Sequence, residues 1–434
     1  MSGIYDKLRM LRHYLGAFTE TVRTNGWSFA IRRAHGFLRG RRANRYIGAF
    51  HQKQPDQNDI QDIIESLKMR PLSRPLLLII SDTQIRQCIH YRIHQKKRYL
   101  DEIGVQTMYI PSDNMGRVRS FLNLAHTVII YRTVISSEQI AEFRNAGLRI
   151  IFEFDDLVVG RKTLKGSGIL KQLTARQNLG LIDLAGKFLE TAQACDEIIV
   201  STPYLAELYA KPENGLAYKT CHVIPNFVET ENYSFLGEKD FTFAYTSPSG
   251  SIHDEVKMMA SFLSGYDITT DYNWTILIMG NDFAYNELNA MGFVKGTVIF
   301  QPMTSFEEYL RNIARAQTVL IPLADHQFNR SKTPIRLLDA AISGTQALFS
   351  PVGDYQSVQM ALSDDRLCIS SDKWENAGYG IAPILAREDA NLSDLQNAVR
   401  ILYGREAAIL CYRSVFIGRM GLRTKMKTEL VTSR

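Results

Sequence analysis

The chain has 434 residues, of which 45% are apolar and 22% are charged, the balance of a globular protein. This length is too great for one ordinary hydrophobic core and is sufficient for two domains. The formal net charge is +6, but residues 1–50, with ten Lys/Arg and two Asp/Glu, contribute +8, and residues 405–434, with seven and two, contribute +5. The body between the two ends therefore carries −7, so a nucleic acid or an anionic membrane would meet the ends of the chain.

The cysteines and the hydropathy pattern argue against several classes of protein. The five cysteines (Cys88, Cys195, Cys221, Cys368 and Cys411) have no CxxC spacing, which favours a reducing compartment and argues against a structural zinc site. No run of about 18 apolar residues is present, so no membrane-spanning helix is predicted. The basic N-terminus lacks a continuous apolar segment, so we do not interpret it as a secretory signal.

Residues 1–50 are predicted to form a basic amphipathic helical extension. Apolar residues recur there at spacings of three and four, and arginines lie off that stripe; the first of the apolar residues are Ile4, Leu8, Leu11, Leu15, Phe18 and Val22. Two interpretations remain open, a helix that lies in the surface of an anionic bilayer and a helix that docks on the protein's own body. Residues 51–72 are polar and bounded by proline, and we interpret them as a linker.

From residue 73 onward, short apolar strands alternate with amphipathic helices in two successive series. The first series spans 73–228 and the second spans 240–392, and the segment between them is polar. This alternation predicts an α/β fold with two doubly wound, Rossmann-like parallel-sheet domains that face each other across a cleft. Residues 393–434, a helix and a basic tail, are expected to pack back towards the first domain. The predicted strands are 75–80, 105–110, 127–132, 149–154, 197–202 and 222–226 in the first series, and 241–247, 274–280, 297–303, 318–323, 346–350 and 367–370 in the second.

Polar side chains follow several strands of the first series, where open parallel sheets bind their ligands. Tyr91 and Arg92 follow the first predicted strand, Arg132 ends the third, and Asp155 and Asp156 follow the fourth. Each of them alone fits a surface ion pair or a helix cap, but together they predict one functional rim. An acid pair can chelate a metal ion, yet adjacent residues of an extended strand point to opposite sides, so no metal site is predicted.

The second series begins with a strand that ends in SPSGSIHDE (247–255). Small residues and Gly250 precede a predicted helix start at His253 and Asp254. A turn of this kind can receive a phosphate through backbone N–H groups, although the pattern is not a GxGxxG motif.

The stretch FNRSKTPIRLLDAAISG (328–344) follows another strand of this series and carries the strongest signal. Thr333 as N-cap and Pro334 as first residue predict a helix over 334–343 that Gly344 ends. Arg330 and Lys332 would then lie beside the positive end of the helix dipole, where a diphosphate or an acidic side chain of the protein fits. Asp339 could accept hydrogen bonds from a sugar diol. The polar residues predicted at this site are Asn329, Arg330, Ser331, Lys332, Thr333 and Asp339.

With these residues in view, the chain resembles the group 1 glycosyltransferases of the GT-B fold, a large retaining bacterial group that uses nucleotide sugars. The resemblance covers about residues 75–405 and is most specific in TVLIPLADHQFNRSKTPIRLLDAAISGTQALFSPVGDY (318–355). Supporting segments are VIIYRTVISSEQIAEFRNAGLRIIFEFDDL (128–157), DEIIVSTPYLAELY (196–209), HVIPNFVE (222–229) and FAYTSPSGSIHDE (243–255).

The resemblance implies that the nucleotide sugar binds the second domain and the acceptor binds the first. By position it assigns the diphosphate to Lys332 with Arg330 close by, the ribose to Asp339, the nucleotide-side loop to His253 and Asp254, and the acceptor side to Asp155, Asp156, Arg92 and Arg132. We take Asp155, Asp156 and Lys332 as the catalytic candidates and add Tyr91 to the acceptor side. Three departures are present: Ser331 stands where many members have Glu, Asp339 replaces the Glu that holds the ribose, and the Arg–Lys pair that many members carry after the first strand of the second domain is missing.

The function implied by the resemblance is transfer of a sugar from a nucleoside-diphosphate sugar to a hydroxyl of a glycan or lipid-linked acceptor in bacterial surface polysaccharide synthesis. Retention of the anomeric configuration, no metal and no cofactor beyond the donor are expected, with no nucleic-acid partner. The expected location is the cytoplasm, with the basic extension at the inner face of the membrane. Two alternatives remain, a nucleotide-sugar epimerase on the same fold and a non-catalytic protein that binds sugar nucleotides.

Overall fold

The structure is a computed structural model, and it describes residues 75–83, 85–173, 175–229, 238–247, 252–385 and 388–417. These residues all belong to one compact unit, Leu72–Arg434. The predictions for residues 1–50, for the linker 51–72, for Gly250 and for the basic tail beyond residue 417 lie outside the described residues.

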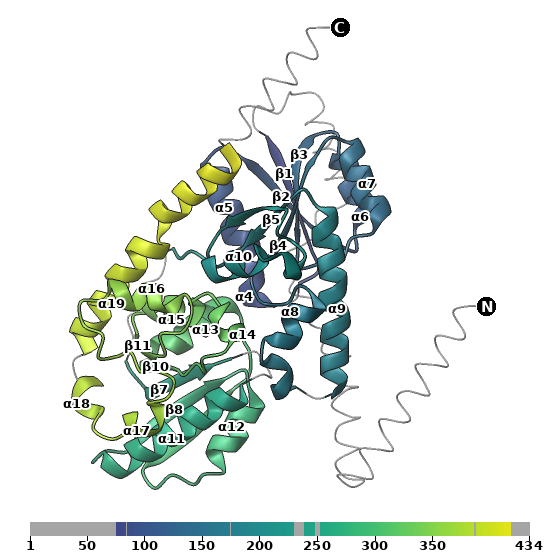
Figure 1. Ribbon diagram of the computed structural model, residues 1–434. Coiled ribbons are helices and arrows are strands. Elements are labelled where there is room, and N and C mark those ends of the chain that lie inside the picture. Colours follow the sequence, from purple (N-terminus) through teal and green to yellow (C-terminus); the bar gives the residue numbers. More distant parts are fainter. Residues whose placement is uncertain are drawn as a thin grey trace, which may run out of the picture. The chain divides into compact units, whose positions relative to one another are not determined.

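The described residues contain a six-stranded sheet and a five-stranded sheet, and every pair of neighbouring strands is parallel (Figure 1). The first sheet has the order β2-β1-β3-β4-β5-β6 and the second has the order β11-β10-β7-β8-β9. The predicted class, two doubly wound parallel α/β sheets, is therefore confirmed. The strands are β1 (Leu76–Ser81), β2 (Gln106–Pro111), β3 (Ala125–Tyr131), β4 (Arg149–Phe154), β5 (Glu197–Val200), β6 (Thr220–Val223), β7 (Phe241–Thr246), β8 (Trp274–Met279), β9 (Gly296–Gln301), β10 (Ala316–Ile321) and β11 (Gln346–Phe349).

Helices cover the faces of both sheets, and the connections that follow β1 and β10 bear on the site. After β1, a π-helical segment (Ile89–His94) joins α4 to α5 in one continuous helix. The helices are α4 (Arg86–Cys88), α5 (Gln95–Glu102), α6 (Met115–Phe121), α7 (Ser137–Asn145), α8 (Arg161–Gly166), α9 (Ala175–Ala194), α10 (Pro203–Tyr209), α11 (His253–Thr269), α12 (Asp282–Asn289), α13 (Phe306–Ala314), α14 (Gln327–Arg330), α15 (Ile335–Ile342), α16 (Tyr355–Ala361), α17 (Trp374–Ala377), α18 (Ala382–Leu385) and α19 (Glu388–Tyr403).

The apolar runs of the sequence form strands that are buried on both faces. Every residue of β1 and of β4 is buried, as a sheet covered on two sides requires. Leu77 and Ile79 of β1 point into a core that α5 and the helix 405–417 complete. The predicted strand at 367–370 is reduced to one bridge between Phe349 and Cys368.

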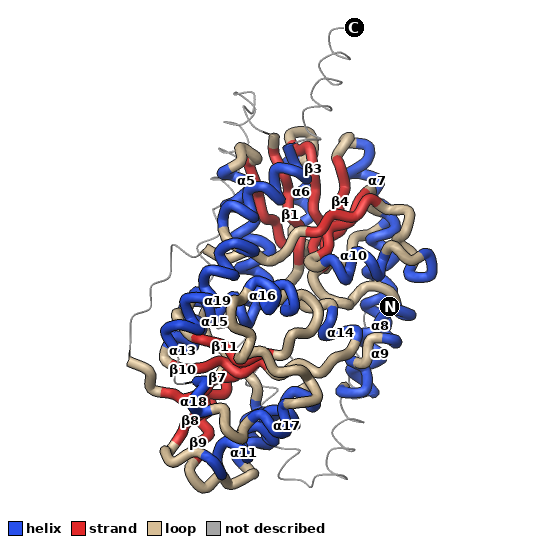
Figure 2. Tube along the Cα trace, turned by 60° about the vertical axis from the view of Figure 1, so that its left-hand side comes forward, coloured by secondary structure: helices blue, strands red, loops and turns tan. Residues whose placement is uncertain are grey.

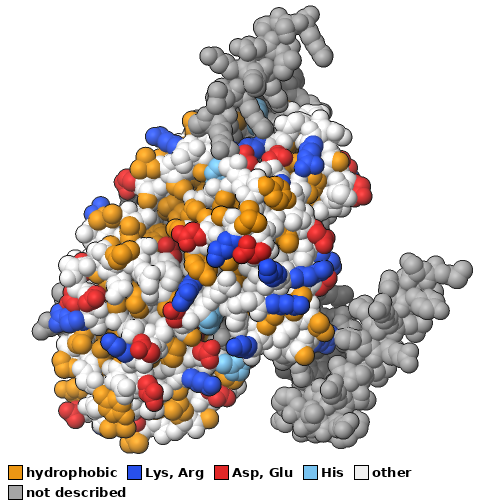
Figure 3. Space-filling view, viewed as in Figure 1, with side chains coloured by type: hydrophobic (Ala, Val, Ile, Leu, Met, Phe, Trp, Pro, Cys, Tyr) orange, Lys and Arg blue, Asp and Glu red, His pale blue; other side chains and the backbone are white. Residues whose placement is uncertain are grey.

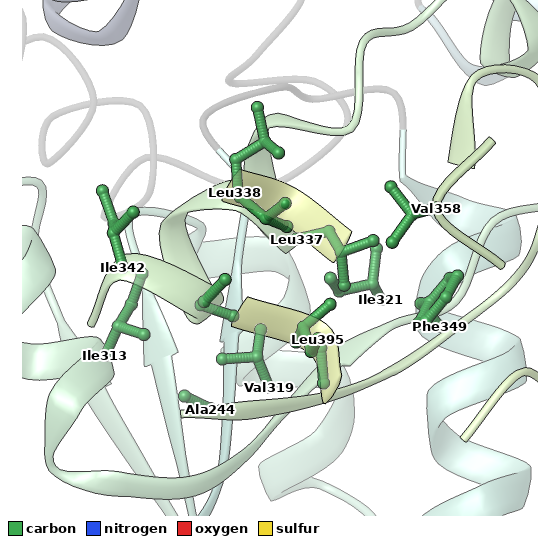
Figure 4. Close-up of a cluster of buried hydrophobic side chains, with 14 of the residues drawn as sticks. Ala244, Ile313, Val319, Ile321, Leu337, Leu338, Ile342, Phe349, Val358 and Leu395 are labelled. Atoms are coloured by element: carbon green, nitrogen blue, oxygen red, sulfur yellow. The ribbon is translucent and has the colours of Figure 1, made fainter. Parts of the chain in front are cut away.

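The second sheet has one apolar core on each face. Figure 4 shows the core in which α15 and α19 pack over the sheet, where Val319 and Ile321 of β10 lie together with Leu337 of α15 and Leu395 of α19. The opposite face packs against α11 and α17. Burial on both sides holds β10 and α15 in place, and with them the loop that joins them, which carries most of the predicted donor residues.

The C-terminal segment is divided between the two domains, unlike the expectation for 393–434. Leu395 and Val399 of α19 belong to the core of the second sheet. The helix 405–417 then returns to the first sheet, where Tyr412 and Phe416 join its core. The difference arises because the apolar stripe of α19 fits the face of the second sheet, so the chain crosses only after α19 ends.

Among the described residues, none of the helices combines the length and the apolar character that crossing a bilayer needs.

Candidate functional site

The strand order of each sheet indicates where a ligand would bind. In a doubly wound sheet the crevice lies beyond the carboxyl ends of the strands, where the strand order reverses. The order reverses between β1 and β3 in the first sheet and between β7 and β10 in the second. The segments that follow β1 and β10, α4 and α14, both lie where the two domains meet (Figure 1). Figure 2 shows loops and short helices at this level, between the two sheets.

Three predicted residues of the first domain meet at the ends of β3 and β4. Nη1 of Arg132 lies 3.0 Å from Oδ1 of Asp155 and 3.2 Å from Oδ2 of Asp156. The chain bends directly after β4, so the expectation that the adjacent carboxylates point to opposite sides is wrong. Arg132 has a φ of 46°, the only positive φ of a non-glycine residue among those described, and such a conformation costs about 1–3 kcal/mol.

The two carboxyl groups of this pair differ in accessibility and in pKa. The exposed fraction of the side chain is 6% for Asp155 and 31% for Asp156. Burial favours the neutral form of Asp155, but the charges of Arg132 and Arg92 outweigh it and hold its pKa below the ordinary value. Burial and then the negative charge of Asp155 raise the pKa of Asp156. Asp156 is therefore the member of the pair that can meet a ligand and exchange a proton.

Arg92, predicted on the acceptor side, is a buried structural residue, so that expectation is wrong. Its side chain is 1% exposed, and its Nε donates to Glu153 at 2.7 Å. Its Nη1 donates to the carbonyl oxygen of Ile224 at 2.8 Å, and Lys96 binds the other oxygen of Glu153. We refer to Arg92, Lys96 and Glu153 as the Glu153 triad. It lies inside the first domain because the helix after β1 turns these side chains against the sheet.

Lys332 does lie at the domain junction, and it shares a carboxylate with a second cation. Nζ of Lys332 lies 3.5 Å from Oε1 of Glu255, which comes from the first turn of α11. Arg336 of α15 donates to the two oxygens of Glu255 at 2.9 Å and 3.3 Å. The exposed fractions are 20% for Lys332, 13% for Arg336 and 3% for Glu255. We refer to these three residues as the Glu255 triad.

Charge and burial oppose each other in the Glu255 triad. Burial raises the pKa of Glu255, but Arg336 and Lys332 outweigh it and hold that pKa below the ordinary value. Burial lowers the pKa of Lys332, an effect that Glu255 counteracts and Arg336 reinforces. The triad therefore holds two cations against one ionised carboxylate.

Two other residues of the predicted site close the loop that carries Lys332. The amide Nδ2 of Asn329 donates to the carbonyl oxygen of Ala324 at 2.9 Å, and the hydroxyl of Ser331 donates to that of Phe328 at 2.7 Å. Both side chains are buried. They shape the loop, and their predicted contact with the donor stays a prediction.

Arg330 and Thr333 have partners within the protein. Arg330 is half exposed and forms a two-pronged ion pair with Asp325, at 2.6 Å and 2.9 Å, and Tyr204 of the first domain also acts on its charge. Thr333 does not cap a helix: α15 begins at Ile335, and the hydroxyl of Thr333 accepts from Nδ2 of Asn226 at 2.7 Å. Thr333 thus joins the second domain to the end of the first.

Asp339 is completely buried between two tyrosine hydroxyls. One carboxylate oxygen accepts from Tyr91 in the π-helical segment of the first domain, and the other accepts from Tyr309 of α13 at 2.8 Å. Burial raises the pKa of Asp339 to about 7, although both tyrosine hydrogen bonds lower it. In this structure Asp339 and Tyr91 thus face each other, not a ligand, because Tyr91 covers this turn of α15.

The remaining predicted donor residues lie at the start of α11. His253 is its first residue, is exposed, and has its ring 4.3 Å from the ring of Phe283. The negative charge of Asp254 acts on His326, which immediately precedes α14. Asp254 therefore lies near the loop that carries Lys332.

Contacts across the domain junction join the loop of Lys332 to the first domain. The hydroxyl of Thr202 donates to the backbone oxygen of Ser331 at 3.3 Å, and the backbone N–H of Phe328 donates to that of Ser167 at 3.1 Å. Lys332 also lies close enough to Asp156 for each charge to shift the other's pKa. Acidic and basic side chains gather at this level on the face shown in Figure 3. The structure thus brings Asp156 and Lys332, predicted from separate domains, into one charged region.

Glu255 and Arg336 belong to this region but were not among the predicted site residues. A signal for Arg336 was available, since it follows Lys332 by four residues, the spacing of one helical turn. Glu255 gave no such signal, because only the fold brings the start of α11 beside the loop that follows β10.

A cavity of about 640 Å³ lies beside the end of β11. None of the predicted residues lines it; those that do are Pro351, Gln359, Asp365, Cys368, Ile369, Ser370, Asp372, Lys373, Asn376 and Ala377. The loop that begins at Pro351 touches the backbone of Arg330 at Gly353, where a Cβ would lie 2.3 Å from a carbonyl oxygen. Glycine is therefore required for this close approach.

The described part of the chain contains no group of three or more His, Cys, Asp or Glu side chains placed to hold a metal ion. The carboxylates of Asp155 and Asp156 both bind the guanidinium of Arg132.

Comparison with known proteins reveals similarity at the level of the fold. No protein-family model and no curated protein matches the sequence. A solved alpha-glucosyltransferase in complex with UDP and a 13-mer DNA containing a HMU base matches with a TM-score of 0.51 at 11% identity, over 79% of this chain and 99% of the other. A complex of an alpha-glucosyltransferase with UDP and a 13-mer DNA containing a central A:G mismatch matches with a TM-score of 0.50 at 12% identity, over 79% and 98%.

A third solved structure, of AviGT4, a glycosyltransferase involved in Avilamycin A biosynthesis, has a TM-score of 0.49 at 13% identity, over 79% of this chain and 96% of the other. The two alpha-glucosyltransferase structures show that the chain has the two-domain fold of these glycosyltransferases, the GT-B fold expected from the sequence.

Proposed function

We propose that the chain is a glycosyltransferase that moves a sugar from a nucleoside-diphosphate sugar to a hydroxyl of a glycan or lipid-linked acceptor, in the synthesis of a bacterial surface polysaccharide. The fold supports this proposal, as does the UDP held by the two alpha-glucosyltransferases that share it. The observation that carries the proposal is the position of Lys332. This largely buried cation follows β10, where the strand order of the second sheet reverses, and it lies near Asp156 of the first domain.

In this reaction the bond between the sugar and the diphosphate breaks, and the nucleoside diphosphate leaves with an additional negative charge. Lys332 would bind that diphosphate. A cation held in place before the reaction stabilises developing negative charge without the cost of reorganising water. The chemistry we propose therefore depends on the charge of Lys332 and needs no metal ion.

The acceptor hydroxyl would be placed next to Asp156. Its side chain is the more exposed of the acid pair, and its pKa is raised, which suits a group that must accept a proton. Asp155 and Arg132 would hold Asp156 in position through their shared ion pairs. The resemblance to the group 1 glycosyltransferases implies retention of the anomeric configuration, so the acceptor oxygen would form its bond to the sugar on the face that the diphosphate leaves.

Asp339 would bind the ribose after an exchange of partners. Its carboxylate now accepts the hydroxyl of Tyr91, which a ribose hydroxyl can replace with the same kind of hydrogen bond. We propose that donor binding displaces Tyr91 and that Tyr309 stays in place. Through residues 1–50 the protein would also contact an anionic membrane surface at the cytoplasmic side.

A thermal-shift panel of nucleoside diphosphates and their sugars tests the proposal, because a ligand that binds only the folded state raises its melting temperature. We expect one nucleoside diphosphate and its sugar to stabilise the protein. Transfer of the sugar from that donor to an acceptor in a bacterial glycan extract would complete the test. Conversion of the donor without an acceptor would favour an epimerase, and binding without any transfer would favour a non-catalytic role.

A further inference from the structure

We infer that Arg336 is a second diphosphate-binding residue and that Glu255 is the positioning residue that holds Arg336 and Lys332 ready for the ligand. The inference rests on the proposed function and concerns the same site. It assigns roles to two residues that were not among the predicted site residues.

Arg336 lies where the second sheet would bind a ligand. Its Nη1 lies 3.4 Å from the backbone oxygen of Thr246, the last residue of β7, and Arg336 itself belongs to α15, which follows β10. It therefore bridges the two strands between which the order of the sheet reverses. A guanidinium at this point can bind phosphate oxygens in a two-pronged manner.

The contacts of Lys332 leave hydrogen-bonding capacity for an anion. Its distance of 3.5 Å to Glu255 exceeds the range of about 2.7–2.9 Å that is typical of charge-assisted hydrogen bonds. Its other close neighbour is the ring of Phe328, whose centroid lies 5.2 Å from Nζ. An ammonium group has three donors, and burial without strong acceptors is costly. A diphosphate that bridges Lys332 and Arg336 would supply those acceptors.

Glu255 is placed to remain in the site when a ligand binds. Its side chain is 3% exposed, and one of its oxygens also accepts the hydroxyl of Tyr245 at 2.8 Å. The ring of Tyr245 lies under the guanidinium of Arg336, at 5.8 Å from its centroid. Glu255 and Tyr245 therefore hold Arg336 from the side of the sheet, while the parts of Arg336 and Lys332 that solvent reaches remain available to a ligand.

The first test compares two arginine variants that lose the same charge. Binding of inorganic pyrophosphate and of ADP, GDP, CDP and UDP is measured by calorimetry for the full chain and for Arg336→Gln, Arg336→Lys and Arg315→Gln. We expect Arg336→Gln to weaken pyrophosphate binding at least about tenfold, the loss of about 1.4 kcal/mol. Arg336→Lys should weaken it less, and Arg315→Gln should stay within about twofold, because Arg315 is paired with Asp240 at the amino ends of β7 and β10, away from the site.

The outcomes separate this inference from the proposed function. If the wild-type chain binds a nucleoside diphosphate and Arg336→Gln behaves like Arg315→Gln, the role of Arg336 is refuted while the proposed function stands. If no nucleoside diphosphate and no pyrophosphate binds the wild-type chain, both fail. Melting temperatures of the variants identify any that do not fold, and Arg336→Lys, which keeps the charge, then decides the point.

The second test addresses Glu255 through the pH dependence of binding. The charged or titratable groups that face Lys332 are Glu255 from α11, Arg336 from α15, Asp156 after β4 and His326 before α14. Of these, Glu255 supports the charged form of Lys332 most strongly. In Glu255→Gln, pyrophosphate affinity should therefore be lost at a lower alkaline pH than in the wild type. An unchanged alkaline midpoint would refute the positioning role, because a purely structural effect of the substitution does not move it.

Discussion

The two domains each contain an arginine and a lysine bound to one glutamate, and the two triads differ in how completely they are satisfied. In the Glu153 triad every side chain is at most 1% exposed. Its arginine also donates to a backbone carbonyl oxygen at 2.8 Å. In the Glu255 triad the two cations are 20% and 13% exposed, and the lysine lies 3.5 Å from its carboxylate.

The difference shows that composition alone does not separate a structural ion cluster from a binding site. Buried charges must find partners within the protein. The charges of the Glu153 triad do so, and the triad is therefore part of the core. The Glu255 triad keeps some contact with solvent and retains unused donors, so a ligand can complete it.

The largest expected difference is in stability between Glu153→Gln and Glu255→Gln. Removing the shared carboxylate of the buried triad leaves two cations without compensation, which should lower the free energy of unfolding by about 3–5 kcal/mol. The same change at Glu255 should cost about 1–3 kcal/mol, because solvent reaches its cations. Urea unfolding of the two variants measures both values. Equal losses would show that the triads do not differ as proposed.

The second prediction concerns the catalytic contribution of Lys332. In Lys332→Ala we expect turnover of the nucleotide sugar to fall about 100-fold or more, since a preorganised charge that stabilises the leaving group is lost. The melting temperature should change little, because Lys332 is loosely paired. Arg315→Gln, which loses a cation outside the site, is the control and should retain its turnover. Unchanged sugar transfer in Lys332→Ala would rule out its role at the diphosphate.

The third prediction uses Asp339, a carboxyl group as buried as Glu153 but bound by tyrosines instead of cations. Its pKa rises from 3.8 to about 7 on folding, so between these values the folded protein holds a proton that the unfolded chain has released. Asp339 should therefore lower the stability as the pH rises through this window, by up to about 1.4 kcal/mol per pH unit. Denaturant unfolding of wild type and Asp339→Asn across pH 4 to 8 measures the difference, which should grow with pH. A constant difference would contradict the raised pKa.

The smallest expected effect is that of Tyr91→Phe on ligand affinity. The hydroxyl that this change removes competes with the ribose in our proposal, and a hydrogen bond of this kind contributes about 1 kcal/mol. The affinity of Tyr91→Phe for the nucleoside diphosphate that the thermal-shift panel identifies should then be about fivefold higher than that of the wild type, as measured by calorimetry. Tyr309→Phe, which leaves the partner from the other domain in place, should produce no such gain. Weaker binding by Tyr91→Phe would contradict the exchange.

The secondary structure and the parallel sheets could be predicted closely from the apolar runs. Eleven of the twelve predicted strands are present, and β4 has the predicted bounds. The exception, 367–370, is short and pairs only at Cys368, because it lies at the margin of the second sheet. The end of α15 could also be predicted from the local sequence, because Gly344, which follows the helix, adopts a φ of 68° that favours glycine.

The candidate site could be predicted only in part, since its residues come from separate elements. Lys332 and Asp156 were predicted from their positions after strands, and the structure places both at the domain junction. Arg92 follows a strand in the same way but is turned into the core by the helix that carries it. Glu255 was missed because its partners are about 80 residues away in the sequence.

What the sequence determined by itself was the alternation of apolar strands and amphipathic helices, which is local and follows from side-chain periodicity. The tertiary structure decided the order of the strands, and with it the two places where that order reverses. The same alternation of strands and helices fits several strand orders, and only long-range packing selects one of them. The tertiary structure also decided how deeply each ion cluster is buried. It made one Arg–Lys–Glu triad a part of the core and left the other at the domain junction with donors to spare.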